Sequence, residues 1–126
     1  MRIRLETNAY YLILQALLDG RYTMVVSPVH FEEANAISDA EEKRGIIAVL
    51  ETLGKRPYVS PTTRARAEDL RSRKFGVADA AHLAFAETTA DFFISCDDIL
   101  VKKCKREKIS IKVLNPVEFT ILEDIK

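Results

Sequence analysis

The chain has 126 residues, of which 48% are apolar, and this is enough to build one hydrophobic core, so a single domain over residues 1–126 is expected. Nineteen basic and nineteen acidic residues cancel, which excludes a global positive field that would draw the whole protein onto nucleic acid or an anionic membrane. No apolar run approaches the roughly 20 residues of a membrane span, and no signal-peptide segment is recognisable, so we expect a cytoplasmic protein without membrane contact.

Predicted helices and short strands alternate along the chain. Helices are indicated by apolar residues at 3.6-residue spacing and by Ser-Pro pairs that suit a cap and a first helical position, and strands by short β-prone runs. The predicted elements, in chain order, are a helix at 4–18, a strand at 22–26, helices that start at Ser27 and Ser38, a strand at 58–59, a helix from Ser60 to about residue 73, a helix over 78–90, a strand at 92–96, a helix that starts at Asp97 or Asp98, and a strand at 109–114. Strands joined by helices predict a three-layer α/β/α fold with a central parallel sheet.

Three carboxylates are predicted to meet at one edge of that sheet. Asp97 ends a strand, Asp79 lies in the first turn of a helix, and Glu33 lies about six residues past the Ser27 cap. Strand ends and the starts of the following helices share the carboxyl edge of a parallel sheet, where ligands usually bind. Clustered carboxylates repel one another unless a cation neutralises them, and ligation by oxygen alone favours Mg²⁺ or Mn²⁺. The predicted chemistry is metal-dependent phosphodiester hydrolysis.

Each of these residues also has an ordinary structural interpretation. An aspartate at a helix start usually caps the helix, which applies to Asp79, Asp97 and Asp98. Of the adjacent pair, we assign Asp97 to the metal and Asp98 to the cap. Glu33 alone is typical of a solvated helix face, and His82, three residues after Asp79, is typical of a satisfied core histidine. Convergence of the carboxylates in space is what favours the functional interpretation.

Two groups of basic residues flank the predicted acidic edge. Such residues suit an RNA phosphate backbone, although lysine and arginine are equally common on ordinary exposed helix faces. The first group precedes the helix of Asp79 and the second follows Asp97; their members are Arg64, Arg66, Arg71, Arg73 and Lys74, and Lys102, Lys103, Lys105, Arg106 and Lys108.

The second half of the chain, FGVADAAHLAFAETTADFFISCDDILVKKCKREKISIKVLNP, contains a D-A-x-H-L-A helix, a strand that ends in S-x-D and a closing strand before Asn-Pro. These motifs resemble the PIN-domain family of ribonucleases, which includes the VapC-type toxins of prokaryotic toxin–antitoxin pairs. Asp79 matches the helix aspartate of that family, Asp97 matches the strand-end aspartate, and Ser95 stands where the family usually has threonine. The stretch VVSPVHFEEANAI is similar to the strand and helix that carry the family's glutamate, and the register from Ser27 gives that role to Glu33.

The resemblance implies a PIN-like fold and cleavage of RNA that depends on Mg²⁺ or Mn²⁺. In this interpretation Glu33, Asp79 and Asp97 are the catalytic and metal-binding residues, and Ser95 supports them by hydrogen bonding. The resemblance also implies an antitoxin protein as a partner and a homodimer as the assembly.

The beginning of the chain departs from the family's pattern, which opens with a central strand that ends in an aspartate. In one alignment residues 2–5 form this strand and Glu6 replaces the aspartate. In the other, residues 4–18 form one helix and the first strand is missing, which the helical periodicity and the 27-residue separation of Glu6 from Glu33 favour. The sequence therefore predicts a metal-dependent endoribonuclease or, as the alternative, a catalytically silent PIN-like module that binds RNA or a protein partner because an active-site aspartate is missing.

Overall fold

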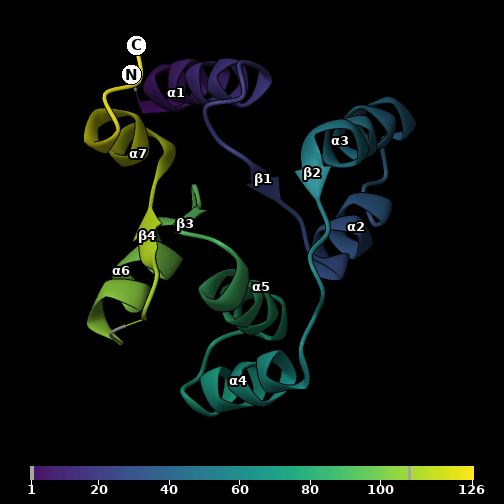
Figure 1. The fold of residues 1–126 in the computed structure, drawn as a ribbon, viewed down its shortest axis with the longest axis vertical. Coiled ribbons are helices and arrows are strands. Elements are labelled where there is room, and N and C mark those ends of the chain that lie inside the picture. Colours follow the sequence, from purple (N-terminus) through teal and green to yellow (C-terminus); the bar gives the residue numbers. More distant parts are fainter. Residues whose placement is uncertain (1, 108) are drawn as a thin grey trace. The chain divides into compact units, whose positions relative to one another are not determined.

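The structure, a computed structural model, describes residues 2–107 and 109–126 and is mostly helical (Figure 1). Within these residues there are seven helices and four short strands. They are α1 (Arg2–Leu18), β1 (Met24–Val25), α2 (Pro28–Asn35), α3 (Ala40–Leu53), β2 (Gly54–Lys55), α4 (Pro61–Ser72), α5 (Val77–Thr89), β3 (Phe92–Ile94), α6 (Asp98–Arg106), β4 (Lys112–Leu114) and α7 (Pro116–Leu122). No helix in the described part of the chain is both long enough and apolar enough to cross a membrane.

The predicted three-layer fold with a central parallel sheet is wrong. The described residues form two separate two-stranded sheets, in which β1 pairs with β2 and β3 pairs with β4. Both pairs are parallel, with Met24 opposite Gly54 and Phe92 opposite Lys112. In each pair the chain passes from one strand to the next through at least one helix, as parallel pairing requires. The alternation of strands and helices was therefore a sound signal for parallel pairing. However, strands of two or three residues are too short to build a sheet that two layers of helices could cover.

The first helix decides between the two alignments of the N-terminal segment. Residues from Arg2 to Leu18 form α1, so the alignment that makes residues 2–5 a strand with Glu6 at its end is wrong. Two other predicted elements also differ from the structure. The strand at 58–59 is absent, because β2 forms directly after α3 instead, and the cap of α3 is Asp39 rather than Ser38.

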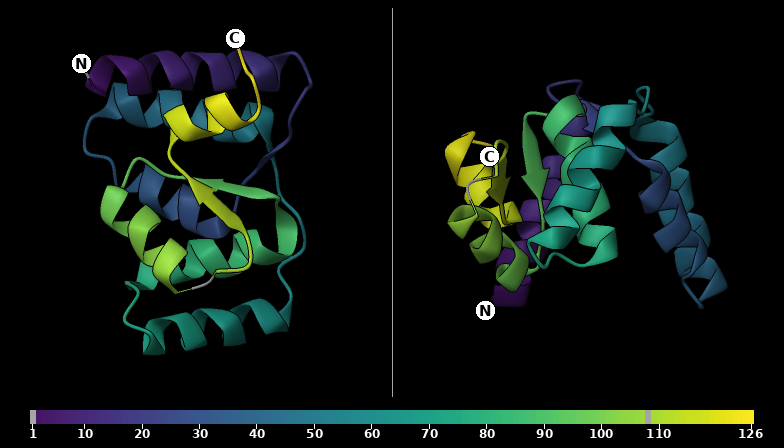
Figure 2. Two further views of the ribbon diagram at one scale, coloured as in Figure 1. Left: turned by 90° about the vertical axis from the view of Figure 1, so that its left-hand side faces the viewer. Right: turned by 90° about the horizontal axis from the view of Figure 1, so that it is seen from below.

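The chain divides into two compact units, and the first unit combines residues 2–22 with residues 90–126. Its core brings α1, α7 and the β3–β4 pair together around Ala16, Phe119 and Ile125. Phe92 meets the edge of Phe119 with ring centroids 5.0 Å apart, and the Tyr22 hydroxyl donates to Glu123 Oε1 at 2.8 Å. Figure 2 shows the paired arrows of β3 and β4 in this unit.

The second unit is the continuous segment of residues 23–89. One part of its core gathers Val26, Ala34 and Leu50, where α2 and α3 pack beside the β1–β2 pair. Helices α4 and α5 pack against each other, and α2 also contacts α5. Leu70 of α4 and Leu83 of α5 are fully buried between the packed elements of this unit, as apolar core residues usually are.

Three helices begin with a cap residue followed by proline; the sequence predicted the first two, α2 and α4, but not α7. Ser27, Ser60 and Asn115 each take the cap position, and each is followed by a proline at the first helical position. Proline suits this position because the N–H that it lacks has no partner within the helix. The cap at Ser27 fixes the register of α2, and this register determines which side chains of α2 reach α5.

Candidate functional site

Glu33 is positioned by α2 so that its carboxylate meets α5. Its Oε1 lies 2.5 Å from Nε2 of His82, whose side chain is 9% exposed, whereas 56% of the Glu33 side chain is exposed. The neighbouring Glu32 is also exposed but makes no ion pair with a described residue. The register predicted from Ser27 thus agrees with the side chain that reaches α5, which is Glu33 rather than Glu32.

Asp79 lies in the first turn of α5, one turn before the histidine that Glu33 contacts. Residues three apart on a helix lie on the same face, so Asp79 and His82 share a face of α5. Two of the three predicted carboxylates, Glu33 and Asp79, therefore belong to helices that contact each other within the second unit.

His30 joins these residues and was not predicted from the sequence. Its ring centroid lies 4.4 Å from that of His82, and its Nδ1 accepts a hydrogen bond from the Ser27 backbone N–H at 2.9 Å, with Ser27 Oγ at 3.1 Å. We call Ser27, His30, Glu33 and His82 the histidine cluster. The available signal was the spacing of three residues between Ser27, His30 and Glu33, which places them along one helix face. It was missed because the Ser-Pro pair was interpreted only as a helix start.

Burial controls the charge of His30. The pKa of His30 is lowered from 6.5 to about 4, first because burial penalises the charged ring and second because His82 lies beside it. The nearby carboxylate of Glu33 acts in the opposite direction but does not prevail. His30 is therefore neutral at pH 7, which agrees with an Nδ1 that accepts hydrogen bonds.

Asp97 lies in the first unit, where it caps α6. Its Oδ1 accepts hydrogen bonds from the backbone N–H groups of Ile99 at 3.0 Å and Leu100 at 3.1 Å. Ser95 Oγ accepts a hydrogen bond from the Asp97 N–H at 3.1 Å and so fixes the turn between β3 and α6. The prediction that Asp98 is the cap is wrong, because Asp98 is the first residue of the helix proper.

The three predicted carboxylates do not all belong to the same unit. Glu33 and Asp79 belong to the second unit, while Asp97 and its neighbour Ser95 belong to the first. Among the residues that the structure describes, no group of three or more His, Cys, Asp or Glu side chains is arranged to hold a metal ion. Individually the carboxylates still suit a hard cation, because hydrogen bonds to described residues engage one oxygen each of Glu33 and Asp97 and leave the second.

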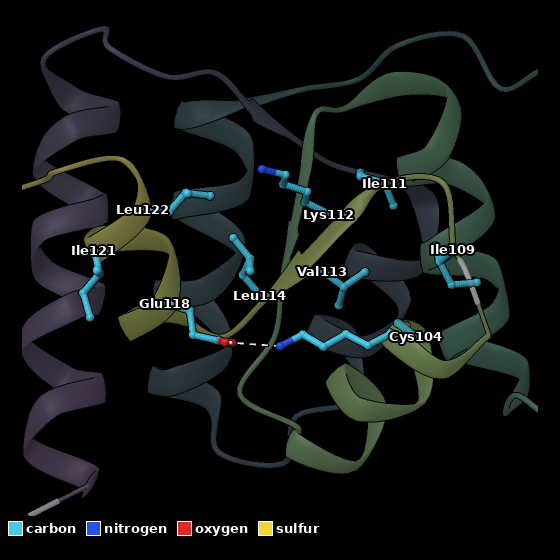
Figure 3. A pocket seen from close by; sticks show the side chains of 10 residues that line it. Cys104, Ile109, Ile111, Lys112, Val113, Leu114, Glu118, Ile121 and Leu122 are labelled. Atoms are coloured by element: carbon cyan, nitrogen blue, oxygen red, sulfur yellow. Dashed lines mark hydrogen bonds and ion pairs between the residues drawn. The ribbon is translucent and has the colours of Figure 1, made fainter.

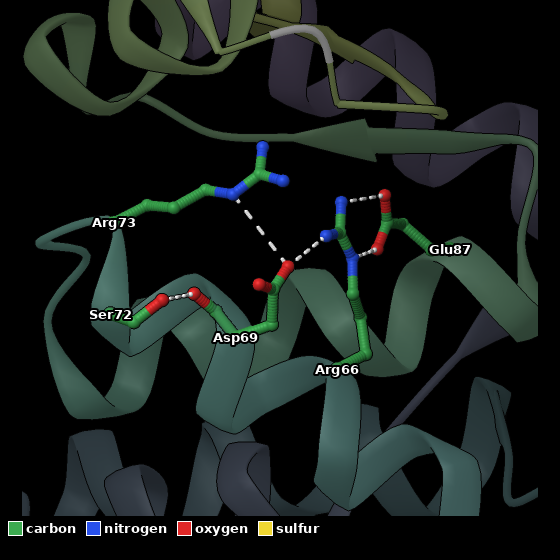
Figure 4. Close-up of polar contacts among 5 residues, drawn as sticks. All are labelled: Arg66, Asp69, Ser72, Arg73 and Glu87. Carbon is green, nitrogen blue, oxygen red and sulfur yellow. Dashed lines mark hydrogen bonds and ion pairs between the residues drawn. The ribbon is translucent and has the colours of Figure 1, made fainter.

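Part of the first basic group is engaged in ion pairs within the protein (Figure 4). Arg66 of α4 donates to both carboxylate oxygens of Glu87 in α5, from Nε at 2.7 Å and from Nη2 at 3.1 Å. It also contacts Asp69 at 2.5 Å, and Arg73 lies 3.6 Å from the same carboxylate. Arg66 thus joins α4 to α5, and both arginines are less free to meet RNA than the sequence suggests.

A hollow of about 550 Å³ opens in the first unit, between β4, α6 and α7 (Figure 3). Its lining is mainly aliphatic, and Lys105 and Glu118 form an ion pair at 3.2 Å on its border. Neither Asp97 nor Ser95 lines this hollow, so it is separate from the predicted site residues of the first unit.

Comparison with known proteins does not identify a family for this chain. The chain matches no protein-family model, no curated protein and no solved structure. The resemblance to the PIN-domain family therefore stays a prediction from the motifs around Asp79 and Asp97.

Proposed function

We propose that the chain is a divalent-metal-dependent endoribonuclease that hydrolyses RNA phosphodiester bonds. The observation that carries this proposal is the contact between α2 and α5, in which Glu33 meets His82 one helical turn from Asp79. The contact supports the proposal because it brings the glutamate of α2 beside the helix that carries the D-A-x-H-L-A motif. Glu33 and Asp79 of the second unit would hold Mg²⁺ or Mn²⁺, and the resemblance to the PIN-domain family adds Asp97 as a further ligand.

The protein's own residues have distinct roles in this proposal. His82 fixes the orientation of the Glu33 carboxylate through their hydrogen bond, and Ser95 fixes the turn that presents Asp97. When bound, the cation would activate water and stabilise the charge that develops on the phosphate. Exposed basic residues of α6, such as Lys102 and Arg106, would hold the phosphate backbone.

A second function is favoured by the form of the N-terminal segment. Because residues 2–18 are helical, Glu6 does not end a strand, and no carboxylate takes the place of the family's first aspartate in that segment. This supports a catalytically silent module that binds RNA or a protein partner and does not cleave.

Cleavage of a mixed RNA pool tests the first proposal. With Mg²⁺ or Mn²⁺, we expect cleavage that chelation abolishes and that falls by about 100-fold in Asp79→Asn and in Glu33→Gln. The matched control is Glu32→Gln, which makes the same change on the same helix and should cleave at the wild-type rate. Equal cleavage by wild type and Asp79→Asn would mean that another site or a contaminant is responsible. RNA binding without cleavage would favour the silent module.

Metal binding can be measured separately from activity. We expect Mg²⁺ or Mn²⁺ to raise the melting temperature of the wild type beyond an ionic-strength control, because a ligand that binds only the folded state stabilises it. The effect should be reduced in Glu33→Gln and retained in Glu32→Gln. A melting temperature that responds to salt alone would remove the metal from the proposal.

An antitoxin protein and a second copy of the chain are the partners that the proposal includes. Light scattering on the purified chain should give a mass twice the 14.3 kDa of one copy. If the chain is a toxin, its expression should arrest growth, and the product of a neighbouring gene should relieve the arrest. A monomeric mass would contradict the homodimer.

A further inference from the structure

The connection between β2 and α4, which Figure 1 shows as an extended segment of the second unit, is exposed over residues 55–59. From residue 52 to residue 67 the sequence contains no acidic residue and four basic ones, which are Lys55, Arg56, Arg64 and Arg66. Arg66 is held in ion pairs, whereas the other three are exposed and make no ion pair with a described residue. This part of the chain therefore carries a local positive potential although the net charge is zero.

Tyr58 presents an open aromatic ring within this basic run. It is 83% exposed and makes no ring contact with a described aromatic residue. Its Cα lies at most about 11 Å from that of Lys55, three residues earlier. On its other side, the next residue Val59 lines the same small cavity as Arg64. We call Lys55, Arg56, Tyr58 and Arg64 the basic–aromatic patch.

Arg56 is held in place by a ring of α2. Its guanidinium carbon lies 4.1 Å from the centroid of the Phe31 ring. The contact is possible because β1 and β2 are parallel, so that Arg56 leaves β2 at the same end at which the chain leaves β1 and begins α2. Stacking uses the face of a guanidinium and leaves its N–H groups free to bind a phosphate. An arginine that is ordered in advance also loses less side-chain freedom when it binds a ligand.

We propose that the basic–aromatic patch binds single-stranded RNA, with one base stacked on the Tyr58 ring and the neighbouring phosphates paired with the three basic side chains. Proteins that bind single strands combine these two features, because every base has an aromatic face and every nucleotide has a phosphate. A duplex does not suit the patch, since its bases are stacked on one another and a side chain cannot cover them. The inference rests on the proposed function for the choice of RNA as the ligand, but it requires neither a bound metal nor cleavage.

Binding of a short labelled single-stranded RNA to the full chain in EDTA, where no metal-dependent cleavage takes place, tests the ligand class. We expect the RNA to bind at least about tenfold more tightly than an abasic ribose-phosphate chain of the same length, which has the same charge but no bases. It should also bind more tightly than the same RNA in a duplex. Equal affinity for the RNA and the abasic chain would overturn the stacking, and the absence of any RNA binding would overturn the patch.

The same measurement separates this inference from the proposed function. If the chain cleaved RNA with Mg²⁺ or Mn²⁺ but showed no base-dependent binding in EDTA, the patch would be wrong and the proposed nuclease would stand. Base-dependent binding by a chain that does not cleave RNA with either metal would support the patch and contradict the nuclease.

Two substitutions of Tyr58 and a matched control test the ring. Tyr58→Ala should lower the affinity for RNA about tenfold and remove the preference over the abasic chain, whereas Tyr58→Phe keeps the ring and should bind like the wild type. Tyr11→Ala removes an exposed tyrosine of the first unit and should also bind like the wild type. Wild-type affinity in Tyr58→Ala, or equal losses in Tyr58→Ala and Tyr11→Ala, would overturn the proposal.

The phosphate contacts are tested through the dependence of affinity on salt. Arg56→Gln should lower the slope of log affinity against log salt by roughly 0.7, since one phosphate contact is lost. The control Arg44→Gln changes an exposed arginine of α3 in the same unit and should leave the slope unchanged. An RNA affinity and slope that neither Arg56→Gln nor Tyr58→Ala alters would overturn the proposal and favour a protein partner for this surface.

Discussion

Asp97 combines a structural role with a proposed chemical one. One of its carboxylate oxygens satisfies two backbone N–H groups at the start of α6, and the same carboxylate is a proposed metal ligand. Asparagine caps helices as well as aspartate does but lacks the negative charge. The two roles can therefore be separated by comparing two substitutions at this position.

We expect Asp97→Ala to lower the free energy of unfolding by about 1 kcal/mol, whereas Asp97→Asn should leave it nearly unchanged. Urea unfolding measures both values. RNA cleavage should be lost in both variants, because each removes the charged ligand. Full activity of Asp97→Asn would show that Asp97 is only a cap, and Asp98→Asn provides the control for a charge change next to the site.

His30 predicts how stability depends on pH. Its pKa is about 4 in the folded protein and 6.5 ordinarily, so between these values the unfolded chain binds a proton that the folded chain excludes. The free energy of unfolding should therefore be constant with respect to this group above about pH 6.5, fall as the pH is lowered towards 4, and then level off.

The substitution His30→Gln tests this, because glutamine can take over the capping contact with Ser27 without titrating. Between pH 7 and 4 the wild type should lose about 1 to 2 kcal/mol more of its free energy of unfolding than the variant. This is less than the full shift in the pKa of His30 would give, because the ring is partly exposed and solvent screens its charge. Urea titrations at each pH give the difference. Glu33 and His82 are present in both proteins, so only His30 differs between them. If the free energy of unfolding changed with pH equally in both, the proposed role of His30 would be wrong.

Sequence reasoning identified some residues of the site and not others. Glu33 was distinguished from Glu32 because a helix cap fixes the register of all that follows, and the Ser-Pro pair is a strong cap signal. The contact between the His30 and His82 rings depends on how α2 packs against α5, and the residue spacing along either helix does not reveal this tertiary packing.

At the scale of elements, Gly54 and Gly45 form a natural pair for comparison. Gly54 ends α3 and starts β2, and a Cβ added there would lie 2.7 Å and 2.8 Å from the two methyl groups of Val26 and would also meet the Leu50 carbonyl oxygen. A Cβ at Gly45, within α3, would meet nothing within 4 Å. The sequence is glycine at both positions, but only the first requires it.

We expect Gly54→Ala to lower the free energy of unfolding by about 1 to 3 kcal/mol, because the added methyl group overpacks the β1–β2 pair. Gly45→Ala should instead raise it by about 0.5 to 1 kcal/mol, since alanine stabilises the helix interior. Chemical denaturation of both variants, under the same conditions as the wild type, measures these changes. Effects of the same sign would contradict the close approach at Gly54.

Helices were more predictable than strands in this chain. Periodicity and caps are local signals, and they gave the helix over residues 4–18 and the starts of α2 and α4, whereas α7 was not predicted. A strand forms only with a partner, and the paired residues are distant in sequence, 30 apart between β1 and β2 and 20 apart between β3 and β4. The sequence therefore indicated parallel pairs correctly, but it did not reveal that they form two small sheets.

At the scale of the whole molecule, the balance of charge limits how the protein can bind RNA. With nineteen charges of each sign there is no net attraction, so binding must come from local groups such as the exposed Lys102 and Arg106 of α6. Each phosphate contact contributes roughly 0.7 to the slope of log affinity against log salt for single-stranded RNA.

Lys102→Gln and Arg106→Gln should each lower this slope by roughly 0.7 and weaken binding uniformly across RNA sequences. Arg44→Gln, on α3 and outside both basic groups, is the control and should leave the slope unchanged. Binding isotherms at several salt concentrations measure the effect. Equal slopes in all three variants would exclude α6 as the RNA contact.

The division into units also has a consequence for synthesis on the ribosome. Residues 23–89 form one unit from a continuous segment, whereas α1 packs on α7, which is made about 100 residues later. At a synthesis rate of about 5 to 20 residues per second, α1 waits roughly 5 to 20 seconds for its partner. During that interval its apolar side chains, Leu12, Ile13 and Ala16 among them, lack the surface that covers them in the finished protein. Helix α1 is thus synthesised well before the helix that covers it, and it is the segment of this unit where a chaperone would be needed.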